Sequence, residues 1–143
     1  MPLGAASVAV VTDLYADPHA TAAEAAAALA TPTGVAHHDV AVIVGSGWVP
    51  AADALGDTVA EISADSLPGF LPPAAIGHAG RVRSVDADGT RVLVFLGRTH
   101  LYEGHGVEPV VHAVRTAAAA GCRSLIVTNG CGGANYCPED QAT

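Results

Sequence analysis

The chain has 143 residues, half of them hydrophobic, and a formal net charge of −8. This length suits a single domain, and the hydrophobic content excludes intrinsic disorder as the default state. All six cations are arginine and none is lysine, which excludes a P-loop lysine and a Schiff-base lysine. The arginines form no basic cluster, so we expect neither a nucleic-acid-binding face nor a polybasic membrane anchor.

The order of apolar runs and turn residues predicts alternating helices and strands. Three helices are expected, over 19–30, 48–55 and 107–120. Prolines near the starts and glycines or prolines near the ends mark their limits. Strand patterns are expected over 39–44, 58–62, 81–85, 91–96 and 124–128. The run Asp86-Ala87-Asp88-Gly89 predicts a hairpin turn, and the proline- and glycine-rich stretch 67–80 predicts a loop.

Two of these strands, 39–44 and 124–128, are continuous apolar runs, which predicts burial on both faces. Each runs into a glycine-rich turn, Gly45-Ser46-Gly47 in one case and 129–133 in the other. The predicted fold is therefore α/β, with a mixed central sheet flanked by helices. Ligands of open α/β sheets bind outside the carboxyl ends of the strands, so we expect the turns at Ser46 and Gly130 to lie side by side at a binding edge.

The segment from Gly97 to His105 concentrates polar side chains directly after a predicted strand. If it stays extended, Arg98, His100 and Tyr102 lie on one side, and the first two offer several donors to an oxyanion. The alternative is a polar loop in which Arg98 pairs with Glu103.

Other glycine-rich segments have both a functional and an ordinary interpretation. Gly45-Ser46-Gly47 suits an anion cradle or simply a tight turn. His78, between two glycines, is either a loop residue or a ligand. The backbone amides of 128–133 suit an anion or a flat ring, whereas Cys131 is not expected to be a nucleophile because no motif supplies its base.

The remaining histidines and cysteines suggest no metal site, because their spacings with one another and with carboxylates are unlike those of metal ligands. Surface, capping or packing roles are expected for His19, His37, His38, His105 and His112. Free thiols are expected for Cys122, Cys131 and Cys137.

Four motifs in order resemble the trimeric purine nucleoside phosphorylases, most closely those of actinobacteria. They are Gly-Ser-Gly at 45–47, Gly-His-Ala-Gly at 77–80, Gly-Arg-x-His-x-Tyr-Glu-Gly-His at 97–105, and Thr-Asn-x-x-Gly-Gly at 128–133. The resemblance covers about residues 37–135 and corresponds to the N-terminal half of a usual family member. It implies a nucleoside phosphorylase-like fold, truncated relative to the family.

The resemblance implies phosphorolysis of purine (deoxy)ribonucleosides to the free base and (deoxy)ribose 1-phosphate, as part of purine salvage. Inorganic phosphate is the co-substrate, no cofactor or metal is needed, and a cytoplasmic homotrimer is expected. The phosphate ligands implied by the motifs are Ser46, His78, Arg98, His100 and Gly130. The implied residues on the sugar and base side are Tyr102, Glu103, which organises the phosphate pocket, and Cys131.

The sequence divides into a leader and helix over 1–36, a phosphate-binding half over 37–133 and a divergent polar tail over 134–143. The family pattern continues past this point with an apolar strand and with the Glu and Asn that recognise the purine. We therefore expect the 143-residue chain alone to lack measurable phosphorolysis and to be marginally folded or prone to association. Two alternatives remain: a non-catalytic remnant that at most binds phosphate, and a relative of methylthioadenosine phosphorylase.

Overall fold

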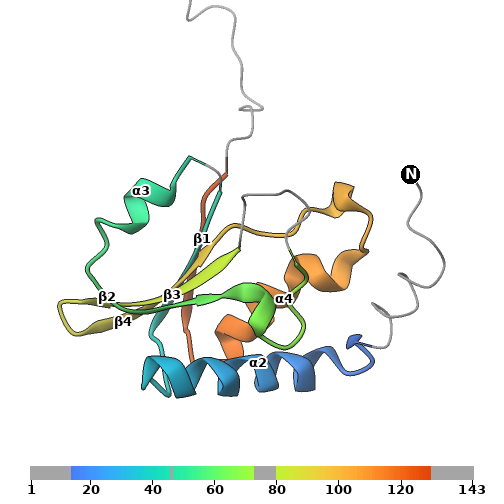
Figure 1. Ribbon diagram of the computed structural model, residues 1–143, viewed down its shortest axis with the longest axis horizontal. Helices are drawn as coiled ribbons and strands as arrows, with labels where there is room; N and C mark the ends of the chain where they lie inside the picture. The colour runs from blue at the N-terminus through green and yellow to red at the C-terminus, as the bar shows by residue number, and fades with distance from the viewer. Residues whose placement is uncertain (1–13, 46, 73–79, 130–143) are drawn as a thin grey trace, which may run out of the picture.

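Five strands form one mixed sheet in the computed structural model (Figure 1), which describes residues 14–45, 47–72 and 80–129. The strands are β1 (Val40–Val44), β2 (Asp57–Ser63), β3 (Arg81–Ala87), β4 (Thr90–Leu96) and β5 (Ser124–Val127). Across the sheet they lie in the order β2-β3-β4-β1-β5. β1 is parallel to both β4 and β5, whereas β3 is antiparallel to β2 and β4. The predicted α/β fold with a mixed sheet is confirmed.

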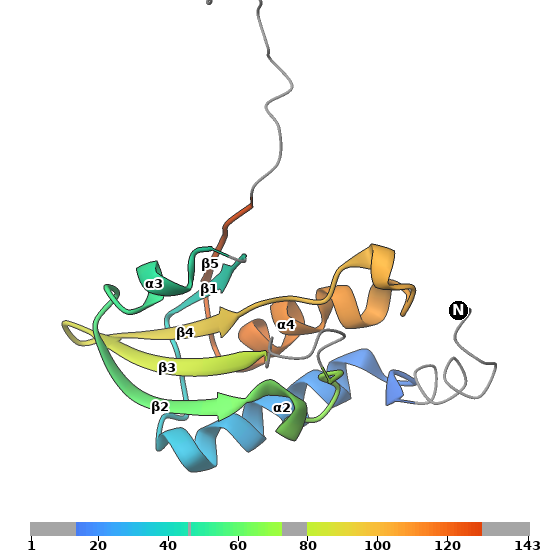
Figure 2. The same ribbon diagram turned by 45° about the horizontal axis from the view of Figure 1, so that its top comes forward.

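Helices cover the sheet unequally. They are α2 (Pro18–Thr33), the short α3 (Val49–Ala52) and α4 (Val107–Ala119), with one-turn 3-10 helices η1 (Ala64–Ser66) and η2 (Leu101–Glu103). α2 and α4 pack on each other and on one sheet face, around Leu29, Ile43 and Phe95. The second apolar cluster lies on the other face and includes Val42 and Val94; among the described residues, Ala52 of α3 is its one buried member from a helix. Figure 2 shows β2, β3 and β4 side by side above α2.

α2 continues past its expected end at Ala30. It stops at Thr33, and Gly34 closes it in the left-handed conformation, with φ 65°. The hydroxyl of Thr33 donates to the carbonyl of Leu29 at 2.7 Å and supports the last turn. Pro32 therefore lies inside the helix, where it removes one backbone donor from a turn that is already ending. α3 is shorter than expected: it covers four of the eight residues predicted to be helical.

The hairpin between β3 and β4 forms where the sequence predicts it. Asp88 and Gly89 occupy its two-residue turn with φ 51° and 89°, the positive values that favour Asp-Gly in such turns. Ala87 pairs with Thr90 across the turn, and the backbone N–H of Gly89 donates to the Asp86 carboxylate at 2.7 Å.

The prediction that β5 is buried on both faces is wrong. Leu125, Ile126 and Val127 are 41%, 55% and 48% exposed. Among the described strands β5 pairs with β1 alone and lies at the edge of the sheet, so neither the second cluster nor another described strand covers it. β2, at the opposite edge, carries acidic residues such as Glu61, whereas β5 has none.

Two histidines are buried packing residues, one of the roles that the sequence allowed. His38 shares a 2.9 Å hydrogen bond with the Ser84 hydroxyl. The Nε2–H of His112 donates to the carbonyl of Pro68 at 2.9 Å, and its ring packs edge-on against Tyr15 and Phe70. Burial lowers the pKa of both imidazoles, and both Nδ1 atoms are buried without a hydrogen-bond partner in the described ranges.

None of the helices within residues 14–45, 47–72 and 80–129 combines the length and hydropathy needed to cross a membrane.

The buried His112 predicts a loss of stability in mild acid. Its folded pKa lies below the ordinary value of 6.5, so the unfolded chain binds the extra proton first and the free energy of unfolding falls as the pH drops below about 6.5. Urea denaturation at pH 7, 6 and 5 should show a shallower pH dependence for His112→Gln than for the parent. The matched control His19→Gln, at an exposed position, should keep the parent slope; equal slopes for all three proteins would contradict this assignment.

The exposed β5 predicts self-association through this edge, because an uncharged apolar edge strand is a template for pairing. Ile126→Glu should reduce concentration-dependent association in sedimentation velocity while leaving the thermal midpoint close to that of the parent. Val59→Glu changes a 45% exposed residue of β2, which already carries acidic neighbours, and should have little effect. Association of Ile126→Glu equal to that of the parent would show that this edge is not responsible.

Candidate functional site

Three parallel strands end together at one edge of the sheet. Val44 at the end of β1 pairs with Leu96 at the end of β4, and Ile43 pairs with Val127 at the end of β5. The segments that follow β1, β4 and β5 therefore start side by side. The sequence predicted this for the segments after β1 and β5. Ser46 and Gly130 themselves lie outside the described residues.

The turn after β1 is tied directly to the end of β5. The backbone N–H of Gly45 donates to the hydroxyl of Thr128 at 2.9 Å. The N–H of Thr128 in turn donates to the carbonyl of Ile43 at 3.0 Å. On the other side of β1, the N–H of Gly97 donates to the carbonyl of Val44 at 3.2 Å. The first residue beyond each of the three strands is thus fixed to its neighbour.

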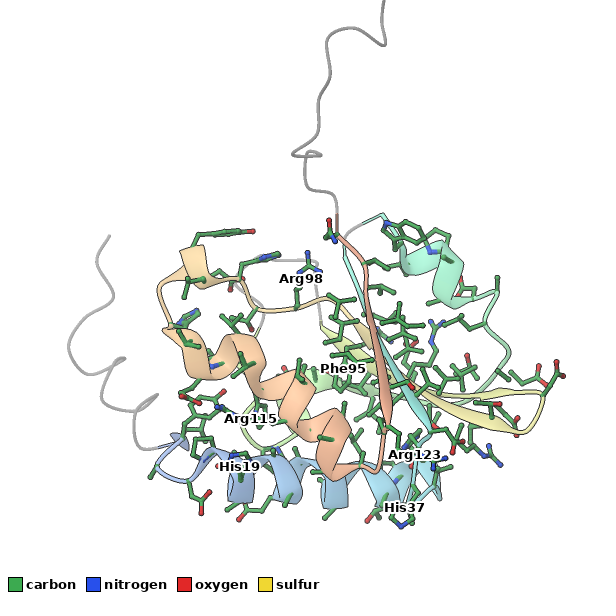
Figure 3. The ribbon with its side chains drawn as sticks, turned by 180° about the vertical axis from the view of Figure 1, so that it is seen from behind. His19, His37, Phe95, Arg98, Arg115 and Arg123 are labelled. Carbon is green, nitrogen blue, oxygen red and sulfur yellow. The ribbon has the colours of Figure 1, made fainter. Side chains whose placement is uncertain are left out.

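Arg98 brings a positive charge to this edge (Figure 3). Its side chain is half-buried, and its Nη1 donates to the carbonyl of Thr128 at 2.5 Å. Its Nη2 is close to Gly45: a Cβ atom added to this glycine would lie 3.9 Å from Nη2. A guanidinium carries five N–H donors, and the bond to Thr128 uses one of them. The alternative in which Arg98 pairs with Glu103 is wrong, because Arg98 bonds to Thr128 instead and Glu103 binds the backbone of His100.

Arg98 also differs electrostatically from most of the other arginines. Carboxylates neutralise the side chains of Arg81, Arg83, Arg91 and Arg115. Within the described part of the chain Arg98 makes no such ion pair, and its hydrogen-bond partner is a neutral carbonyl. Its charge therefore stays available to an anion.

The segment after Arg98 does not stay extended. It turns into η2 after His100, so the alternation that would have placed Tyr102 beside Arg98 and His100 ends there. The ring of Tyr102 nevertheless stacks on that of His100, with centroids 4.8 Å apart and planes at 11°. Tyr102 is 83% exposed, so most of its surface faces solvent.

Glu103 holds the start of η2. Its Oε1 accepts the backbone N–H of His100 at 2.7 Å, and its own N–H donates to the carbonyl of His100 at 3.0 Å. The other carboxylate oxygen lies 4.0 Å from Nε2 of His105. These contacts join Glu103 to His100 and place it near His105, and none of them involves Arg98.

Sequence reasoning gave the side chain of Thr128 no role and considered only the backbone amides of the segment 128–133. In the structure the hydroxyl of Thr128 contacts Gly45 and its carbonyl contacts Arg98. Three expected site residues, His78, Gly130 and Cys131, lie with Ser46 outside the described residues.

Cys122 is the free cysteine in the described ranges and is half-buried. Burial raises the pKa of its thiol to about 11, with a smaller contribution from the negative charge of Asp39, so the thiol stays protonated at neutral pH. Among residues 14–45, 47–72 and 80–129, no group of three or more His, Cys, Asp or Glu is arranged to hold a metal ion.

Comparison with known proteins points to one enzyme family. The chain is 49% identical over 123 residues to the purine nucleoside phosphorylase of Mycobacterium tuberculosis and 52% identical over 128 residues to that of a Cellulomonas species. A crystal structure of the Schistosoma mansoni purine nucleoside phosphorylase superposes with a TM-score of 0.72 at 28% identity, over 81% of this chain. Sequence and fold both support the purine nucleoside phosphorylase family.

The match covers most of this chain but less than half of each purine nucleoside phosphorylase. The alignments cover 86% of this chain but 46% of the M. tuberculosis protein and 45% of the Cellulomonas protein, and the S. mansoni superposition covers 42% of that chain. The chain thus spans about half the length of the curated relatives that it matches. No family model matches it.

The contacts of Glu103 predict that its carboxylate protects the backbone amide of His100. Glu103→Ala should raise the hydrogen-exchange rate of that amide by about tenfold, the effect of losing one hydrogen bond. Glu103→Gln retains an acceptor oxygen and should keep most of the protection in the same amide-exchange NMR measurement. Unchanged exchange in Glu103→Ala would contradict the assigned contact.

Proposed function

We propose that this protein is a purine nucleoside phosphorylase whose phosphate site lies at the shared carboxyl ends of β1, β4 and β5. The observation that carries the proposal is Arg98, half-buried, without a carboxylate partner in the described chain, and fixed between the ends of β1 and β5. An arginine at the carboxyl edge of parallel strands is a suitable anion ligand. The 49–52% identity to purine nucleoside phosphorylases supports phosphate as that anion.

The reaction needs no nucleophile from the protein. An oxygen of hydrogen phosphate attacks the anomeric carbon of the nucleoside, a C–O bond forms and the C–N bond to the purine breaks. The proton that hydrogen phosphate loses balances the proton that the leaving purine gains. The site must hold phosphate beneath the anomeric carbon and support an oxocarbenium-like transition state. No cofactor takes part in this step. Related structures were solved with ribose-1-phosphate and, for the S. mansoni protein, with inosine, in line with this substrate class.

The proposed residue roles follow the motifs. The phosphate ligands are Ser46, His78, Arg98, His100 and Gly130. Tyr102 contacts the sugar, which its exposed ring stacked on His100 allows. Glu103 positions His100 through its backbone N–H, and Cys131 lies near the base.

The finer assignments are also proposals. They comprise an actinobacterial type of enzyme, a homotrimer in the cytoplasm, a role in nucleoside salvage, and the division into segments 1–36, 37–133 and 134–143. A second candidate function is phosphate binding without turnover. The exposed apolar side chains of β5 favour it for this chain in isolation.

Arg98→Ala tests the phosphate site. A charge-assisted hydrogen bond contributes about 1.5–3 kcal/mol, so phosphate affinity measured by calorimetry should fall roughly 10- to 150-fold. Arg123→Ala is the matched control, because Arg123 is exposed and lies at the opposite end of the sheet (Figure 3). Equal affinity for Arg98→Ala and the parent would contradict the proposed site.

Inosine turnover in the presence and absence of phosphate separates the two candidate functions. Phosphate-dependent release of hypoxanthine that is lost in Arg98→Ala supports the phosphorylase. Tight phosphate binding without hypoxanthine release supports the binding protein.

A further inference from the structure

We infer that Thr128 is a positioning residue of the proposed phosphate site, which fixes the glycine turn after β1 and the Arg98 guanidinium relative to each other. The inference rests on the proposed function and adds a residue that does not itself need to touch phosphate.

The geometry is unusual because one residue serves three segments. The hydroxyl of Thr128 accepts the N–H of Gly45 at 2.9 Å. Its carbonyl accepts Nη1 of Arg98 at 2.5 Å, and its N–H donates to the carbonyl of Ile43 at 3.0 Å. The last bond continues the β1–β5 ladder, whereas the first two reach beyond the ladder to the two segments that the phosphate site requires.

Phosphate binds most tightly when its hydrogen-bond donors are already in place. Arginine has a long side chain that loses much rotamer freedom when it is held in one position, and a glycine turn has a flexible backbone. Thr128 restrains both without supplying a charge. Because binding energy is not then spent on ordering the site, a restrained pair of donors binds and orients the anion better than a mobile pair.

The hydroxyl is the part of Thr128 that packing does not explain. Valine has the same shape and suits the end of a strand equally well, but it has no acceptor for the Gly45 N–H. Serine keeps that acceptor and loses only a methyl group. The carbonyl that holds Arg98 is present in all three residues, so Thr128→Val loosens the turn while leaving the arginine anchored.

The test measures inorganic phosphate binding by calorimetry in the purified parent, Thr128→Val, Thr128→Ser and Thr116→Val. Thr116 lies in α4, and its hydroxyl has no hydrogen-bond partner among the described residues; it is fully buried, whereas Thr128 is half-buried. Thr128→Val should weaken phosphate binding roughly 2- to 10-fold, the effect of one neutral hydrogen bond and less than that of Arg98→Ala. Thr128→Ser should restore the parent affinity, and Thr116→Val should retain it.

Amide exchange and thermal unfolding separate positioning from a merely structural role. The hydrogen-exchange rate of the Gly45 amide, which donates to the Thr128 hydroxyl, should rise in Thr128→Val and return to the parent rate in Thr128→Ser. The thermal midpoint of Thr128→Val should stay close to that of Thr116→Val.

Three results would overturn the inference: parent-like phosphate affinity in Thr128→Val, no rescue by serine, or loss of cooperative unfolding in Thr128→Val alone. A parent protein that binds no phosphate would instead refute the proposed function, and the inference with it. The two failures are therefore distinct.

Discussion

The parallel pairing of β1 with both β4 and β5 is the constraint on which the rest of the structure depends. Parallel strands carry their carboxyl ends to the same edge and need long crossover connections, and α4 is the crossover between β4 and β5. The register brings Val44, Leu96 and Val127 to the ends of their strands together. The contacts that join Gly45, Arg98 and Thr128 follow from this alignment.

Burial makes this alignment specific. The side chains of β1 from Ala41 to Val44 are buried, and a slip of one residue would exchange the two faces of the strand. Ile43 packs under α2 and α4, whereas Val42 belongs to the second cluster. The hydrophobic pattern of a five-residue strand thus places Gly45 beside Thr128, although the two residues are 83 positions apart.

Charge distribution explains how an acidic protein with a net charge of −8 can offer a site to an anion. Four arginines are paired with carboxylates and contribute little net positive potential around them. Arg98 is held by a carbonyl oxygen instead. A small anion is attracted by the charge and the donors in its immediate surroundings, because net charge at longer range is screened by salt.

Local patterns in the sequence determined most of the elements and the chemistry of the site. Apolar runs predicted β1 and β4, the Asp-Gly pair predicted the hairpin, and the polar cluster after residue 97 indicated the segment that brings Arg98 to the candidate site. These signals are local, because turn conformation and side-chain type depend on neighbouring residues. The order of the motifs also indicated the enzyme family that the comparisons support.

Tertiary structure alone decided burial, pairing and partner choice. The apolar run of β5 predicted a buried strand, but its position at the edge exposes Leu125, Ile126 and Val127. The sequence allowed Arg98 to pair with nearby Glu103, yet the sheet brings the carbonyl of Thr128 within reach, 30 positions away. Hydrophobicity shows that a residue favours burial, but the strand order decides what covers it and which polar groups meet.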